Sequence, residues 1–214
     1  MIVVSGAIGC GKSSLTTLIS KELGLKAQYE SVDDNEILPL YYSNMEKYAL
    51  LLQIYFLNTR FKAIKESFKY NNTINDRSIY EDSLFFHKLA DDGLVTKKEV
   101  EIYDSLVDNM MEELNSMEKK SPDLLIHIEV SLEKMLERIE KRGRDYEQVK
   151  NNPELYNYYK DLNTRYYKWY DNYSHSPKMK INGDKLDFVN NESDKKFVIN
   201  NIKQELLKNN IHWQ

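Results

Sequence analysis

Eight consecutive residues near the start of the chain, Gly6–Ser13, have the composition and spacing of a phosphate-binding loop. The glycines let several backbone N–H groups face one polyphosphate, and the helix that follows adds about half a positive charge at its N-terminus. Lys12 is expected to reach the β- and γ-phosphates, and the Ser13 hydroxyl is expected to bind Mg²⁺. The sequence therefore predicts a nucleoside triphosphate site formed by Gly6, Ala7, Ile8, Gly9, Cys10, Gly11, Lys12, Ser13 and Ser14.

Charged residues also follow the next two predicted strands. Glu30 ends a short strand expected over residues 27–30, and Asp76 and Arg77 end another that begins at residue 73. Parallel strands bring their carboxyl ends to one edge of a sheet, so these side chains are expected beside the phosphate loop. A carboxylate there can accept a proton from an attacking hydroxyl. An Asp–Arg pair can hold Mg²⁺ and balance developing phosphate charge, although ordinary structural charges would give the same pattern.

Helical spacing places Gln53 and Arg60 on one face of a long helix expected over residues 45–70, with Phe56 between them. A glutamine side chain both donates and accepts hydrogen bonds, which suits the edge of a nucleobase. Polar residues on a helix surface show the same spacing, so both interpretations stay open on the residues alone.

Three arginines, Arg138, Arg142 and Arg144, surround Gly143, and Glu147 follows shortly after them. One guanidinium group can bind two phosphate oxygens at once, and a glycine lets the segment fold over a ligand. Together these features are typical of a lid that closes on a transferring phosphate. The alternative is a solvated basic helix end that the helix dipole stabilises.

The bulk composition narrows the classes of function. A chain of 214 residues is long enough for one domain with a substantial core, and its net charge of −4 gives no support for a nucleic-acid-binding surface. The single cysteine, Cys10, excludes a disulfide within the chain and indicates a reducing, cytoplasmic compartment. The longest apolar run is too short to cross a membrane, and the chain opens on a strand rather than a signal peptide.

Hydrophobic periodicity predicts strands that alternate with helices, which indicates an α/β fold with a parallel sheet covered on both faces. The predicted strands cover residues 1–5, 27–30, 73–75, 124–130 and 179–181, and a long loop is expected from residue 31 to about 44. The predicted helices cover residues 12–23, 45–70, 79–90, 96–117, 132–142, 153–173 and 192–209.

With these motifs in this order, the chain resembles the deoxynucleoside kinases, and most closely the deoxyadenosine and deoxyguanosine kinases of low-GC Gram-positive bacteria. The resemblance runs from the first strand to about Phe188. It implies a three-layer P-loop kinase fold in a single domain, residues 1–214, with an arginine-rich lid at about 138–150. The segments that carry it are residues 6–13, 29–32, 42, 53–60, 76–82, 138–147 and 183–188.

The resemblance also implies roles for individual residues. For catalysis it implies Glu30 as the general base for a 5′-hydroxyl, with Arg77 and Lys12 on the reacting phosphate and Ser13 and Asp76 at Mg²⁺. For the nucleoside it implies Tyr42 and Glu147 at the sugar 3′-hydroxyl, Gln53 and Phe56 near the base, Arg60 and Asp82 over it, and Phe86 stacked on it. For ATP it implies the lid arginines Arg138, Arg142 and Arg144 and a segment at Asp187 and Phe188 that closes over the adenine.

Two positions depart from the family pattern. Ser31 follows Glu30 where the family usually has a proline, so the segment after the base is expected to be less rigid. Asp76 stands where many members have a glutamate, and its shorter side chain is expected to contact Mg²⁺ through water. Neither departure removes a functional group.

The resulting hypothesis is ATP-dependent phosphorylation of the 5′-hydroxyl of a deoxyribonucleoside for nucleotide salvage, with Mg²⁺. Through the resemblance, the Arg60–Asp82 pair argues against thymidine and the most similar branch of the family argues for a purine, while the choice among deoxyadenosine, deoxyguanosine and deoxycytidine stays open. A thymidylate kinase-like enzyme is the first alternative, but residues 30–36 are too acidic for a phosphorylated acceptor. A nucleotide-gated switch is the second, and it would not need Tyr42, Gln53 and Glu147 around an acceptor pocket.

The predicted helices over 45–70 and 96–117 carry more apolar surface than one sheet face needs. The resemblance implies that part of this surface forms a dimer interface, either with a second copy or with a sibling kinase. The expected partners are therefore a deoxyribonucleoside and another kinase subunit, with no nucleic acid and no membrane.

Overall fold

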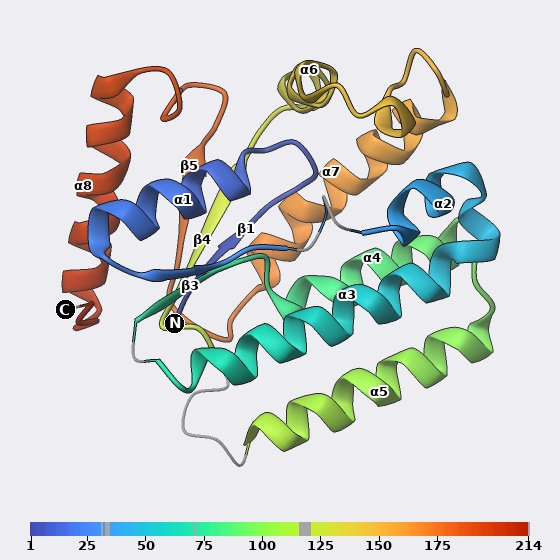
Figure 1. The fold of residues 1–214 in the computed structure, drawn as a ribbon, viewed down its shortest axis with the longest axis horizontal. Coiled ribbons are helices and arrows are strands. Elements are labelled where there is room, and N and C mark those ends of the chain that lie inside the picture. Colours follow the sequence, from blue (N-terminus) through green and yellow to red (C-terminus); the bar gives the residue numbers. More distant parts are fainter. Residues whose placement is uncertain (31, 33–34, 71, 116–120, 214) are drawn as a thin grey trace.

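The computed structural model describes the chain except for residues 31, 33–34, 71, 116–120 and 214. Its centre is a five-stranded parallel sheet in the order β2-β3-β1-β4-β5 (Figure 1). The strands are β1 (Ile2–Ser5), β2 (Lys26–Gln28), β3 (Thr73–Asp76), β4 (Leu124–Glu129) and β5 (Lys178–Asn182). The α/β fold with a central parallel sheet between helices, as the sequence predicts, is confirmed.

The helices are of two kinds. Within the described residues eight are α-helical: α1 (Lys12–Leu23), α2 (Ile37–Ser43), α3 (Met45–Ser67), α4 (Asp82–Asp91), α5 (Lys97–Asn115), α6 (Leu132–Arg142), α7 (Glu154–Asn172) and α8 (Glu192–Lys208). Two 3₁₀ turns, η1 (Ile79–Glu81) and η2 (Asp145–Glu147), precede α4 and follow α6. Among the described helices, none is both long and apolar enough to span a membrane.

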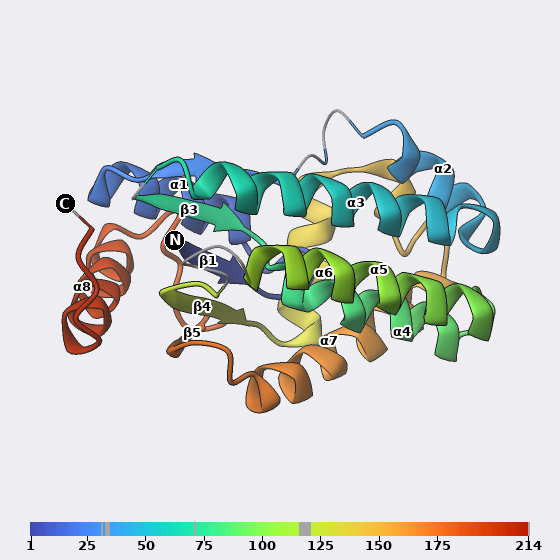
Figure 2. The same ribbon diagram turned by 90° about the horizontal axis from the view of Figure 1, so that it is seen from below.

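Successive apolar side chains of the central strands point to opposite faces of the sheet, and both faces are buried. Ile2 and Val4 of β1 belong to a core that includes residues of α1 and α8, whereas Val3 packs with Leu125 of β4 and with Tyr173 at the end of α7. A further core joins α2, α3, α4 and α5, and the last three of these lie side by side (Figures 1 and 2). Because both faces are covered, only the ends of the strands can open into a ligand site.

Three local differences separate the structure from the sequence prediction. The segment before α3 holds a helix, α2, where a loop is expected, and the Asn35 side chain caps it by accepting from the N–H groups of Ile37 and Leu38 at 2.9 and 3.1 Å. Strand β2 ends at Gln28, so Glu30 lies just beyond the strand. A 3₁₀ turn replaces the first turn of the helix expected from residue 79.

Candidate active site

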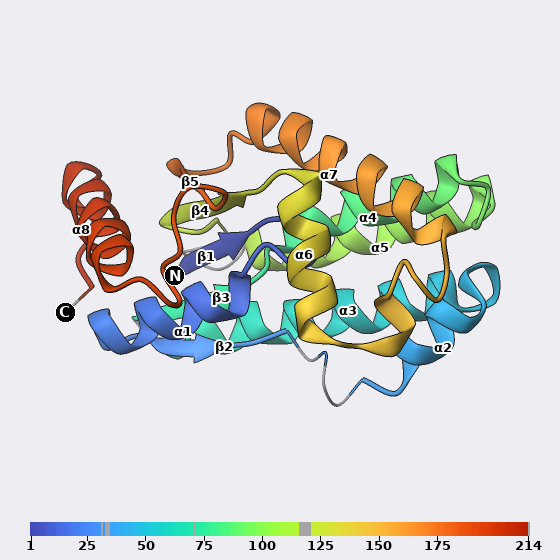
Figure 3. The same cartoon turned by 90° about the horizontal axis from the view of Figure 1, so that it is seen from above.

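A cavity of about 600 Å³ opens beyond the carboxyl ends of β1, β2 and β3. The phosphate loop, α2, α3, α6 and the segment over residues 183–190 line it. Seen from above, α6 lies across the end of β1 (Figure 3). Of the predicted site residues, the cavity is lined by Ile8, Gly9, Gly11, Lys12, Ser13, Ser14, Glu30, Tyr42, Gln53, Phe56, Arg60, Asp76, Arg77, Arg138, Arg142, Arg144, Glu147, Asp187 and Phe188.

Contacts within the phosphate loop and with neighbouring residues fix the conformation of its backbone. Gly6 has a φ of 141°, and a Cβ atom there would meet the Cys10 Sγ and the Ile128 carbonyl oxygen at 2.7 Å, so only glycine fits. Lys12 Nζ donates to the Ala7 carbonyl at 3.0 Å. Gly6, Ala7 and Cys10 lie behind the cavity wall and face the core, and burial raises the pKa of the Cys10 thiol. The loop therefore offers backbone and Lys12, rather than Cys10, to a phosphate.

Ser13 and Asp76 meet beside the loop, as expected for residues that share a cation. The Ser13 hydroxyl donates to Asp76 Oδ2 at 2.5 Å, and no described residue donates a hydrogen bond to the buried Oδ1. Burial raises the pKa of Asp76, and the Lys12 charge opposes this only in part. A carboxylate in such surroundings is stabilised by a further positive charge next to it.

Glu30 lies between two arginines. The Arg77 Nε is 3.0 Å from Glu30 Oε1, and the Arg60 guanidinium donates to the same oxygen. Arg60 also pairs with Asp82, which is fully buried behind it and does not line the cavity. Burial alone would raise the pKa of Glu30, but Arg77 first and Arg60 next lower it to about 2. Glu30 is thus an ionised carboxylate at the sheet edge, next to the loop.

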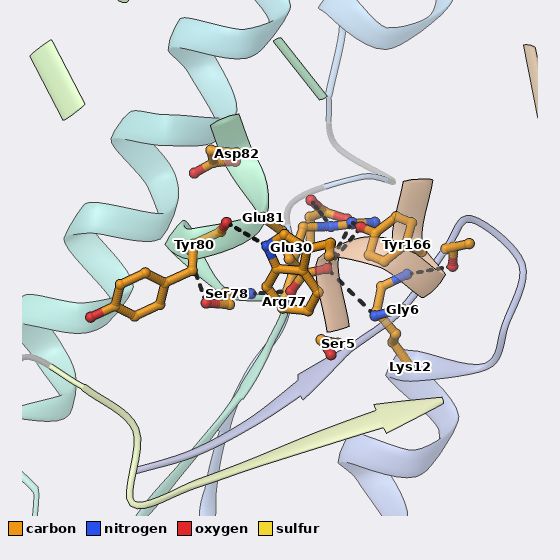
Figure 4. Close-up of polar contacts among 12 residues, drawn as sticks. Ser5, Gly6, Lys12, Glu30, Arg77, Ser78, Tyr80, Glu81, Asp82 and Tyr166 are labelled. Carbon is orange, nitrogen blue, oxygen red and sulfur yellow. Dashed lines mark hydrogen bonds and ion pairs between the residues drawn. The ribbon is translucent and has the colours of Figure 1, made fainter. Parts of the chain in front are cut away.

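Arg77 has an unusual backbone. Its φ is 84°, in the left-handed region that a residue with a Cβ rarely adopts, and its N–H donates to the Val4 carbonyl at 2.8 Å. Its guanidinium contacts Glu81 and Tyr166 as well as Glu30 (Figure 4). Sequence reasoning missed Glu81 and Tyr166 as site residues, because they lie 85 positions apart and no local motif links them.

The wall opposite the phosphate loop comes mainly from α3. Gln53, Phe56 and Arg60 all face the cavity, as their helical spacing predicts. Phe86 does not, which corrects the expectation that it stacks on a base in this cavity. It is fully buried and stacks on Tyr103 with ring centroids 4.1 Å apart, while Phe85 lines the cavity instead. The 3₁₀ turn before α4 sets the register in which Phe85 faces the site.

Tyr42 and Glu147 lie on the same side of the cavity, on α2 and η2. Burial raises the pKa of Tyr42 well above its usual range, and nearby Tyr159 adds to this, so the phenol keeps its proton. Glu147 is 3% exposed and pairs with two lid arginines, Arg142 and Arg144, the latter at 3.6 Å. The protonated phenol and the carboxylate together offer one hydrogen-bond donor and one acceptor to a ligand.

The third lid arginine is tied to the phosphate loop. Arg138 donates to the Cys10 carbonyl at 2.5 Å and to the Gly183 carbonyl at 2.7 Å. Phe188, 4% exposed, lies against Gly11, where an added Cβ would be 3.4 Å from its ring. Asp187 accepts from the N–H groups of Val189 and Asn190 and so shapes the turn beside it. The lid and the segment over 183–190 therefore close one side of the cavity.

Several lining residues were not predicted. They include the apolar and aromatic side chains of Leu38, Tyr41, Leu52, Phe85 and Tyr158, and the cations Lys134, Lys141 and Lys185. Leu38 and Tyr41 belong to α2, which sequence reasoning missed as a helix. Lys134 and Lys141 lie on α6 together with Arg138 and Arg142, and this shared helix is the signal that would have found them. Lys185 lies in the segment over 183–190.

Comparison with known proteins agrees with this geometry. Residues 2–208 match the deoxynucleoside kinase family. A deoxyguanosine kinase of Lactobacillus johnsonii is 58% identical over 96% of this chain and 92% of its own. A deoxyadenosine kinase of Lactobacillus acidophilus is 50% identical over 96% of each chain. The structure of deoxyadenosine kinase from M. mycoides with bound dATP, which has the P-loop kinase fold, is 28% identical, with a TM-score of 0.79 over 94% of this chain and 98% of that one. This chain is therefore a phosphotransferase and belongs to the deoxynucleoside kinase family.

Proposed function

We propose that the protein transfers the γ-phosphoryl group of ATP to the 5′-hydroxyl of a purine deoxyribonucleoside. The observation that carries this proposal is the position of Glu30 and Arg77, between the phosphate loop on one side and Gln53 on the other, in a single cavity. A carboxylate there can take the proton of an acceptor hydroxyl while the neighbouring arginine balances charge on the phosphate.

The chain's own groups supply the remaining steps mostly by positioning. The phosphate loop and Lys12 hold the β- and γ-phosphates. Tyr42 and Glu147 hold the sugar through its 3′-hydroxyl, which leaves the 5′-hydroxyl near Glu30. When the nucleoside binds, Glu30 is released from one of its two arginines. This raises the basicity of Glu30 as the 5′-hydroxyl loses its proton. The lid arginines Arg142 and Arg144 release Glu147 and bind phosphate oxygens instead.

Ser13 and Asp76 fit a Mg²⁺ ion. The free Oδ1 of Asp76 and the raised pKa of that carboxyl favour a cation at this point. Within the described residues, no three acidic, histidine or cysteine side chains gather as a complete metal site. Mg²⁺ typically binds through one or two protein groups together with substrate phosphates and water, and when bound it would neutralise charge on the transferring phosphate.

The buried Arg60–Asp82 pair beside Gln53 argues against thymidine, and the names of the two Lactobacillus relatives support a purine. Of the alternatives, a thymidylate kinase-like enzyme is not favoured by any of the family, relative and structure matches. The acidic stretch over residues 30–36 argues against a phosphorylated acceptor. It includes Asp33 and Asp34, which lie outside the described residues, as does Ser31. A nucleotide switch is likewise not favoured.

Two further proposals concern the setting of the enzyme. Exposed apolar side chains on α3 (Leu51, Ile54) and on its neighbour α5 (Ile102) support a dimer through these helices, with a second copy or a sibling kinase. The lone cysteine supports a reducing cytoplasm, where phosphorylation of free deoxynucleosides would serve nucleotide salvage.

The direct test is a phosphorylation assay with the four deoxynucleosides, ATP and MgCl₂, run beside Glu30→Gln. We expect turnover of deoxyadenosine or deoxyguanosine, with kcat about 10²- to 10⁴-fold lower in the variant. Glu36→Gln, which neutralises an exposed carboxylate six positions further along the chain, is the matched control and should retain full activity. Turnover of thymidine alone would refute the purine preference, and phosphorylation of monophosphates only would refute the proposal as a whole.

A further inference from the structure

Glu81 is a fully buried carboxylate for which the mechanism above has no use. Its two oxygens have different partners. Oε1 accepts from the Ser78 N–H at 2.8 Å and completes the capping box of η1. Oε2 accepts from the Tyr166 hydroxyl at 2.7 Å and lies 3.4 Å from both Arg77 Nη1 and the Gly6 N–H. One oxygen therefore belongs to a turn and the other to the active site.

Oε2 joins three elements that are distant in the sequence. Gly6 is the first residue of the phosphate loop, Arg77 follows β3, and Tyr166 lies on α7 (Figure 4). The Tyr166 hydroxyl also contacts Arg77 Nη1, so carboxylate, phenol and guanidinium form a closed set of contacts. Burying a carboxylate is costly unless charged and hydrogen-bonding partners compensate. A one-turn cap needs only Oε1, so the cap does not explain why Oε2 is buried here.

Arg77 needs such support. Its left-handed φ of 84° is strained for a residue with a Cβ, and strain of this kind persists only where the surroundings fix it. Its guanidinium has two ends, with Nε on Glu30 at 3.0 Å and Nη1 on Glu81 and Tyr166. When Glu30 turns to a substrate hydroxyl, the contacts to Glu81 and Tyr166 are the ones that remain.

We propose that Glu81, together with Tyr166, is a positioning residue that fixes Arg77 against the first glycine of the phosphate loop. This proposal rests on the proposed function. In this position the Arg77 charge lies at the transferring phosphate while Glu30 takes the proton of the acceptor hydroxyl. Glu81 does not touch the substrate, and its effect on the reaction passes through Arg77 and Gly6. Burial raises the pKa of Glu81, and the charges of Arg77 and Lys12 oppose this effect.

The test compares Glu81→Gln and Tyr166→Phe with wild type. Glutamine keeps the shape and one acceptor for the Ser78 N–H, but it presents an NH₂ donor to the donors around Oε2. Phenylalanine removes only the hydroxyl and leaves the capping box intact. For both variants we expect kcat to fall by about a hundredfold, because Arg77 is misplaced. The nucleoside KM should change by less than about threefold, because Gln53 and Tyr42 are untouched.

Two control variants separate this role from ordinary stability. Ser78→Ala removes the other half of the capping box, in which Ser78 Oγ accepts from the Tyr80 N–H at 3.0 Å. Tyr167→Phe removes a hydroxyl from the same helix as Tyr166, where it donates to the Val130 carbonyl at 2.9 Å. Both controls should keep the wild-type kcat. The double variant Glu81→Gln/Tyr166→Phe should lose little more than either single variant, since both break one network.

The outcomes are distinguishable. Wild-type kcat in Tyr166→Phe, or an equal loss of kcat in Ser78→Ala, would overturn the positioning role and leave the proposed kinase function standing. If Glu81→Gln fails to fold, Tyr166→Phe alone decides between these results, because it preserves the cap and the packing of the ring. A wild-type protein that phosphorylates no deoxynucleoside would overturn both the proposed function and this inference.

Discussion

At the scale of single residues, Glu30 illustrates how a carboxylate can be buried and still carry its charge. Its side chain is 10% exposed, yet the guanidinium groups of Arg77 and Arg60 more than offset the cost of burial. Asp76 and Glu81, a short distance away, lack that excess of positive charge, and burial raises the pKa of each. The pKa values of neighbouring carboxyls therefore shift in opposite directions because of their partners.

The lowered pKa of Glu30 predicts how stability depends on pH. The folded pKa of about 2 lies below the ordinary 4.5, so the stabilisation is present above about pH 4.5 and is lost as the pH falls toward 2. A shift of this size corresponds to about 3 kcal/mol. Urea unfolding should show wild type more stable than Glu30→Gln at neutral pH, with the difference shrinking below about pH 4.5. A difference that stays constant down to about pH 3 would contradict the prediction.

The two adjacent phenylalanines of α4 give a second prediction. Phe85→Ala removes a ring from the cavity wall and should raise the nucleoside KM by about tenfold. Phe86→Ala removes a ring that stacks on Tyr103 and should lower the free energy of unfolding by about 3–5 kcal/mol with little change in KM. Steady-state kinetics and urea denaturation of both variants check this. The opposite assignment of the two effects would restore Phe86 as the stacking residue.

At the scale of elements, the phosphate loop depends on α6 as much as on β1 and α1. A Cβ at Gly9 would lie 2.8 Å from the Ile139 side chain and 3.0 Å from the Met135 carbonyl of α6. Arg138 of the same helix donates to the Cys10 carbonyl in the loop. The helix that carries Arg138 and Arg142 is therefore packed directly on the phosphate loop, so a displacement of either moves the other.

This packing predicts an unequal effect of two similar substitutions. Gly9→Ala and Gly93→Ala both place a Cβ at a left-handed φ, 76° and 73°. At Gly93 the new atom would meet open space among the described residues, whereas at Gly9 it would push against the backbone of α6. We expect Gly9→Ala to raise the KM for ATP by about tenfold or more. Gly93→Ala should only reduce thermal stability, by about 1–2 kcal/mol. Equal ATP kinetics in the two variants would refute the coupling of loop and lid helix.

Elements with a local signal could be predicted from the sequence. The phosphate loop is contiguous, and the spacing of Gln53 and Arg60 needs only helical geometry. Helix α2 has only seven residues and contains a proline, so its local signal is weak, but Pro39 stands in the first turn, where no N–H is needed. The choice between Phe85 and Phe86 depends on a helix register that one 3₁₀ turn changes. The Glu81–Tyr166 contact depends on tertiary packing, which no local pattern encodes.

At the scale of the whole molecule, the sheet order determines where function gathers. Strands β2, β3 and β1 are neighbours, so the segments that follow them, with Glu30, Arg77 and Gly6, emerge at one edge. Helices α3, α4 and α5 lie beside one another and leave apolar side chains of α3 and α5 exposed. The catalytic edge and the proposed interface thus share helix α3, which contributes Gln53 and Arg60 to the first and Leu51 and Ile54 to the second.

The shared helix leads to a prediction about assembly. Leu51→Glu/Ile54→Glu should convert a dimer into monomers in sedimentation velocity experiments, because it places charges in an apolar interface. The same double substitution on exposed positions of α8, Phe197→Glu/Leu207→Glu, is the matched control and should sediment like wild type. A wild-type protein that sediments as a monomer at all concentrations would refute the proposed interface.

The position of β1 has a consequence for how the chain is made. β1 precedes the other described strands in the chain, yet its two neighbours are β3, which begins at Thr73, and β4, which begins at Leu124. During synthesis β1 is therefore unpaired on both sides until β3 has been made. It stays unpaired on one side until β4 has been made, when more than half of the chain has been translated. Sheets built from such distant pairs form slowly and expose apolar edges in the meantime. The same topology that brings Glu30, Arg77 and Gly6 to one edge thus leaves an apolar strand edge exposed for that interval.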